Sequence, residues 1–118
     1  EVVKRVKESE QDGAKVFIAA AGMAAHLAGA IAAQTTKPVL GIPLGGGDLD
    51  GIDSLLATVQ MPKGVPVATF AIGKSGAINA ALCAVQILGT SDEKIAEMLT
   101  EYKSKMHDDV LAANESIQ

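Results

Sequence analysis

The segment AAAGMAAHLAG, residues 19–29, places an imidazole four positions after a glycine that ends an apolar run. Because Gly22 has no Cβ, the backbone there can approach a bound molecule closely. We expect a helix over residues 23–34, whose first amides would hold a carboxylate. His26 would lie one turn into this helix, and an imidazole is suited to proton transfer near neutral pH. The alternative is a structural histidine in an alanine-rich helix.

A second glycine-rich segment, GIPLGGGDLDG at residues 41–51, contains a predicted strand and the turn after it. It could approach a phosphate or serve as a flexible loop, and it lacks the GxGxxG spacing of dinucleotide-binding turns. Asp48, Asp50 and Asp53 lack the ligand order and the closing glutamate of a calcium-binding EF-hand loop. The sequence therefore predicts no metal site here.

Two other features have simpler explanations than catalysis. Gly73, Lys74 and Ser75 resemble the end of a P-loop, but Ala68 stands where that motif needs its first glycine. We expect Lys74 and Ser75 to cap a helix. The single cysteine, Cys83, lies in an apolar run, which is typical of an unreactive thiol in a reducing compartment.

The uncharged stretch over residues 16–34 raises the alternative of a membrane span. His26 would then lie near the middle of the bilayer, where a polar ring is costly, and the pattern changes at Gly22 from strand-like to helix-like. We interpret the stretch as fold core. The net charge of −4 disfavours nucleic acid as a partner, and we expect a cytoplasmic protein.

Strand and helix patterns alternate along the first 89 residues. Amphipathic residues 1–12 predict a helix that ends at Gly13. The expected strands cover residues 16–21, 39–43 and 65–72, and the expected helices cover residues 23–34, 50–61 and 75–88. This alternation predicts an α/β fold with a parallel sheet.

The remaining residues, 90–118, predict one long helix with a capping box at residues 90–93. At 1.5 Å per residue, about 25 residues would extend ~37 Å, longer than a small domain is wide. Its apolar stripe therefore predicts contact with a neighbouring subunit in a homo-oligomer. The stripe consists of Ile95, Leu99, Tyr102, Met106 and Val110.

We expect a single domain over residues 1–118, with its α/β core at residues 1–89. The sequence begins within a helical pattern and contains three predicted strands, fewer than the average of about five or six strands in a sheet. A strand-helix-strand portion is therefore expected to precede Glu1 in the parent protein.

Three strings together resemble the class I PurE family, the N5-carboxyaminoimidazole ribonucleotide mutases of purine biosynthesis. Residues 21–29 match its AGxxAHLPG pattern, with Ala28 in place of proline. Residues 41–69 match its GVPV to GVPVAT region, and residues 72–82 match its IGKAGAxNAAL stretch. The family's GSxSD and SAHR motifs are absent, so this chain alone is expected to be inactive.

The resemblance implies a flavodoxin-like three-layer α/β/α sandwich, assembled as a homo-octamer with active sites at subunit boundaries. It implies an aminoimidazole ribonucleotide substrate and no metal or organic cofactor. His26 matches the family's pocket histidine and is the expected catalytic residue. The expected substrate-binding residues are Ala21, Gly22, Met23, Ala24 and Leu27. Two alternatives stay open: direct carboxylation by carbon dioxide, as in class II enzymes, and a truncated non-catalytic paralogue.

Overall fold

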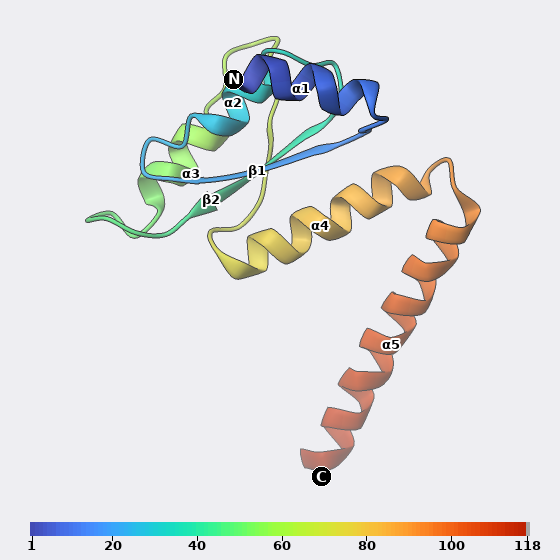
Figure 1. Cartoon of the computed structure of the whole chain (residues 1–118). Helices are drawn as coiled ribbons and strands as arrows, with labels where there is room; N and C mark the ends of the chain where they lie inside the picture. Colours follow the sequence, from blue (N-terminus) through green and yellow to red (C-terminus); the bar gives the residue numbers. More distant parts are fainter. Residues whose placement is uncertain (118) are drawn as a thin grey trace. The chain divides into compact units, whose positions relative to one another are not determined.

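The computed structural model describes residues 1–117, which form five helices and three strands among them (Figure 1). Contacts divide the chain into two compact units, Glu1–Ala84 and a second that begins at Val85. The elements, in chain order, are α1 (Val2–Gln11), β1 (Phe17–Gly22), α2 (Leu27–Ala32), β2 (Val39–Leu44), α3 (Ile52–Val59), β3 (Ala68–Thr69), α4 (Lys74–Gly89) and α5 (Glu93–Ile117).

The strands form one parallel sheet in the order β1-β2-β3, which confirms the predicted α/β class. β1 and β2 pair over their whole length, from Phe17 opposite Val39 to Gly22 opposite Leu44. The third strand is shorter than the predicted 65–72, since only Ala68 and Thr69 keep the regular register. Pro66 has no backbone N–H to donate to a ladder, which limits the strand on that side.

Gly41 in the middle of β2 lets two helices pack closely on one face of the sheet. A Cβ added to Gly41 would lie 2.5 Å from Thr58 Cγ2 of α3 and 3.5 Å from Ala28 Cβ of α2. α2 and α3 therefore cover the same face. The small core beneath them is formed by Ala19, Ala28 and Val39.

The other face of β2 is also buried, as expected for a central parallel strand. Leu40 and Ile42 are 1% and 5% exposed. Figure 1 shows the first turns of α4 on this side of the strands, and Ala80 in those turns is fully buried. Helices thus flank the parallel sheet, as in the flavodoxin-like arrangement that the sequence predicts.

The predicted start of the second helix is wrong. α2 begins at Leu27 rather than at residue 23, and His26 is its N-cap residue rather than a residue one turn inside. Met23 and Ala25 have φ angles of +49° and +45°, which a right-handed helix does not accommodate. Residues 23–26 are therefore a turn.

The long helix α5 spans 25 residues, close to its predicted length. Its cap is Asp92 rather than Thr90, because Asp92 Oδ1 accepts hydrogen bonds from the amides of Lys94 and Ile95 at 3.0 and 3.2 Å. No residue of α5 that the structure describes is buried. Within residues 1–117, no helix is long and apolar enough to cross a membrane.

Candidate active site

The turns that follow the strands meet at the carboxyl edge of the sheet. Gly22 and Leu44 pair at the ends of β1 and β2, so residues 23–26 and 45–51 start side by side. A Cβ added to Gly47 would lie 3.8 Å from Met23 Cγ, so the two turns lie close together. Open parallel sheets bind ligands at this edge.

The loop after β3 joins the same edge. Gly73 donates a backbone hydrogen bond of 2.9 Å to the carbonyl of Pro43, near the end of β2. Gly51 adopts φ +94°, and a Cβ there would lie 2.7 Å from Ile72 Cγ2. Glycine at position 51 is therefore required both by the backbone conformation and by the close approach of Ile72.

Left-handed backbone conformations are concentrated in these turns. Of the residues that the structure describes, the non-glycine residues with positive φ are Met23, Ala25 and Asp50, the last at +52°. Such conformations cost free energy and are found at functional sites, where the surrounding fold holds them in place. The carboxyl edge is thus the candidate site on backbone evidence as well as on position.

His26 presents an accessible ring at this edge. Its backbone carbonyl accepts the amide of Ala30 at 3.0 Å and so starts α2, while its side chain makes no capping bond. The residue is exposed, as are Met23 and Ala24 beside it. A solute at the edge of the sheet can therefore reach the imidazole.

The six predicted site residues lie along one stretch, but they do not all face one space. Ala21 and Gly22 end β1 and are half-buried. Leu27 lines a separate apolar groove of about 170 Å³, together with Val6 of α1 and Phe17 of β1. The side chain of Leu27 therefore lies beside α1, although the residue directly follows the turn.

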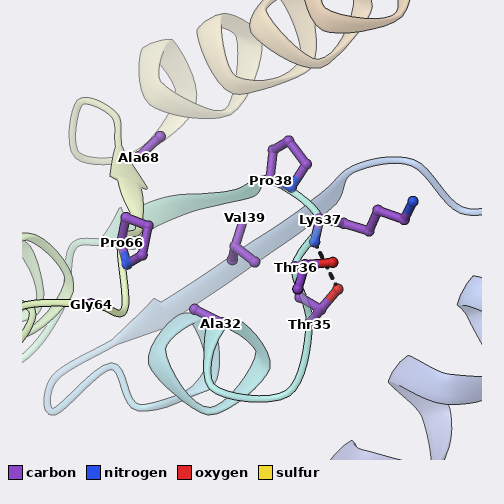
Figure 2. Close-up of a pocket in the computed structure, with 9 residues that line it drawn as sticks. All are labelled: Ala32, Thr35, Thr36, Lys37, Pro38, Val39, Gly64, Pro66 and Ala68. Atoms are coloured by element: carbon purple, nitrogen blue, oxygen red, sulfur yellow. Dashed lines mark hydrogen bonds between the residues drawn. The ribbon is translucent and has the colours of Figure 1, made fainter.

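Residues 21–26 line none of three cavities in the described part of the chain, which have volumes of about 430, 170 and 450 Å³. Figure 2 shows one of them, a cavity of about 430 Å³ between Pro38 and Pro66. It is lined by Val39 and Ala68, at the starts of β2 and β3, which is the opposite edge of the sheet. Across residues 1–117, no group of three His, Cys, Asp or Glu side chains could hold a metal ion.

Sequence reasoning missed a buried polar pair in α3. Ser54 is 0% exposed, and its hydroxyl is within hydrogen-bond distance of the carbonyls of Leu44 (2.8 Å) and Gly51 (2.9 Å). Thr58 is 3% exposed and donates to the carbonyl of Ser54 at 2.7 Å. The available signal was their spacing of four, which places both hydroxyls on the inner face of a helix.

The left-handed conformation of Asp50 predicts a large difference between two similar substitutions. Asp50→Val should lower the free energy of unfolding by about 1–2 kcal/mol, because a β-branched side chain is poorly tolerated at positive φ. Asp48→Val is the matched control, since Asp48 is exposed in the same loop and is not among the residues with positive φ. Urea unfolding of both variants measures the difference, and equal effects would contradict it.

Comparison with known proteins agrees with these features. The chain matches the AIR carboxylase family over residues 1–109. It is 51% identical over 105 residues to the N5-carboxyaminoimidazole ribonucleotide mutase of Escherichia coli K12, covering 89% of this chain and 62% of that protein. It is 50% identical over 109 residues to the protein of the same name from Bacillus subtilis, covering 92% and 67%.

The archaeal protein of that name from Saccharolobus solfataricus is 49% identical over 111 residues, covering 94% of this chain and 69% of the relative. The chain thus spans about two thirds of the length of these relatives, and 62% of the Escherichia coli protein. With its parallel sheet and its histidine turn at the carboxyl edge, the chain belongs to the AIR carboxylase family.

Proposed function

We propose that this chain is part of an N5-carboxyaminoimidazole ribonucleotide mutase of purine biosynthesis. The main support is an identity of about half with proteins of that name from bacteria and an archaeon, across nearly all of this chain. The reaction would move a carboxylate from the exocyclic nitrogen of the ribonucleotide to C4 of its imidazole, forming 4-carboxy-5-aminoimidazole ribonucleotide. No metal or organic cofactor takes part in this proposal.

In the proposed mechanism, the N–C bond of the carbamate breaks and its electron pair stays on nitrogen, which takes up a proton. C4 then attacks the released carbon dioxide and loses its own proton, so one proton moves in net from carbon to nitrogen. His26 would donate a hydrogen bond to the migrating carboxylate, and its exposure at the edge of the sheet supports this contact.

Carbon dioxide carries no charge, so it must be confined by walls rather than by an ion pair. Ala21, Gly22, Met23 and Ala24 would provide one such wall, in which the small residues Ala21, Gly22 and Ala24 leave room for a planar substrate. The turn is open to solvent in residues 1–117. We therefore propose that the remaining walls come from a second subunit and from further segments of a longer protein, since the relatives are longer than this chain.

Substrate preference tests the assignment. The full-length protein should convert N5-carboxyaminoimidazole ribonucleotide faster than it carboxylates aminoimidazole ribonucleotide supplied with bicarbonate. Product formation is followed in parallel with each substrate at equal concentration. Faster conversion of the second substrate would favour direct carboxylation, and no conversion of either would favour a non-catalytic assembly protein.

Replacement of His26 tests the proposed catalytic role. His26→Ala in the full-length protein should lower kcat at least about 100-fold, the scale for losing a positioned proton-transfer or hydrogen-bonding group. The matched control is His107→Ala, which removes the only other histidine, an exposed residue of α5. Near-normal turnover of His26→Ala, at unchanged oligomer mass, would make the residue structural.

We further propose a cytoplasmic homo-octamer in which α5 packs on a neighbouring subunit. The support is an apolar stripe with no buried member: Tyr102, Met106 and Val110 are 43%, 52% and 64% exposed. Large apolar side chains gathered on one face are typical of an interaction surface.

Charge introduced into this stripe should break the assembly. The double variant Met106→Glu, Val110→Glu is expected to lower the oligomer mass in light scattering, because two buried carboxylates without partners are costly at an interface. Lys103→Glu and Lys105→Glu together form the control, since they also introduce two glutamates but at exposed positions outside the stripe. Unchanged mass in the first variant would place the subunit interface elsewhere.

A further inference from the structure

Ser54 occupies a position from which one hydroxyl reaches both ends of a loop. Its Oγ lies 2.8 Å from the carbonyl oxygen of Leu44, the last residue of β2, and 2.9 Å from that of Gly51, just before α3. The six residues between, 45–50, are all exposed. The hydroxyl has one proton to donate, so the two carbonyls share it.

The hydrogen bond from Ser54 to Leu44 should contribute to stability because Ser54 is fully buried. Removing a buried donor leaves the carbonyl of Leu44 without this partner and costs more than removing an exposed one. The carbonyl of Gly51 also accepts the amide of Leu55 at 2.9 Å, so the bond to Leu44 is the one that ties loop to strand.

The loop in turn lies beside the histidine turn. Leu44 pairs with Gly22, and Gly47 approaches Met23 Cγ. Met23 itself has a left-handed backbone that needs support from its surroundings. The Ser54 hydroxyl is therefore linked to the turn that presents His26 by its bond to Leu44, by the pairing of Leu44 with Gly22, and by the proximity of Gly47 to Met23.

We propose that Ser54 is a positioning residue for the candidate active site: its hydroxyl fixes the loop over residues 45–50, which holds the turn over residues 23–26. The catalytic part of this inference rests on the proposed function, whereas the structural link between loop and turn does not. Hydrogen exchange and turnover can therefore test the two parts separately.

The first experiment measures amide hydrogen exchange in the 118-residue chain carrying Ser54→Ala. Exchange should accelerate about tenfold or more over both residues 45–50 and residues 22–26, although the substitution lies in α3. The matched control is Thr58→Val, which removes a second buried hydroxyl from the same helix and keeps the branched side chain beneath Gly41. Its hydroxyl bonds only within α3, so exchange at both turns should stay unchanged.

Unchanged exchange at residues 22–26 in Ser54→Ala would overturn the link, as would equal acceleration by Thr58→Val. If Ser54→Ala does not fold, Met23→Ala tests the same contact from its other side. That variant removes the side chain that meets Gly47. It should accelerate exchange over residues 45–50, and no change there would also overturn the link.

The second experiment measures kcat and KM in the full-length protein. Ser54→Ala should lower kcat about tenfold or more with little change in KM, because displacement of a catalytic group by about 1 Å can cost 100-fold in rate. Thr58→Val should stay within about twofold of the wild type. Altered exchange with normal kcat would overturn the positioning role, whereas an inactive wild type with altered exchange would overturn the proposed function and leave the link standing.

Discussion

The parallel pairing of β1 with β2 up to the Gly22–Leu44 pair is the constraint on which the site depends. Because both strands end at the same level, the chain must turn away twice within a few ångströms. The turn after β1 solves this with left-handed residues at Met23 and Ala25, and the loop after β2 with a run of glycines and Asp50. The backbone strain and the proximity of the two turns have the same cause.

Small side chains allow this crowding and also leave the site open. Gly41 admits Thr58 and Ala28 above the sheet, and Gly51 admits Ile72 at its edge. A core of alanine and valine allows backbones to approach closely, but such small side chains cannot cover a pocket. With aromatic residues at 3%, the chain has few large side chains that could close over His26. The high share of small residues thus explains both the close packing of the helices on the sheet and the exposure of the turn at its carboxyl edge.

The sequence predicted the repeating features better than the local ones. Continuous apolar runs predicted strands at residues 16–21 and 39–43, which the structure has at Phe17–Gly22 and Val39–Leu44. An apolar repeat of three and four residues predicted the long helix. The sequence pattern misplaced the start of α2, since an alanine-rich segment gives no signal of positive φ. It also gave no indication that Ser54 would bond to Leu44, because that contact depends on how the loop folds back. Whether residues 21–27 bind substrate stays a prediction.

The openness of the edge is informative about the proposed chemistry. A histidine that must act on carbon dioxide needs a dry enclosure, and residues 1–117 expose its ring to water. The same residues leave apolar side chains uncovered elsewhere: Ile52 and Leu56 of α3 are 55% and 52% exposed, four positions apart on one helix face. Under the proposed function, other polypeptide segments would pack both on the exposed apolar face of α3 and on the turn at His26. The histidine turn would then form one side of a composite site under that function.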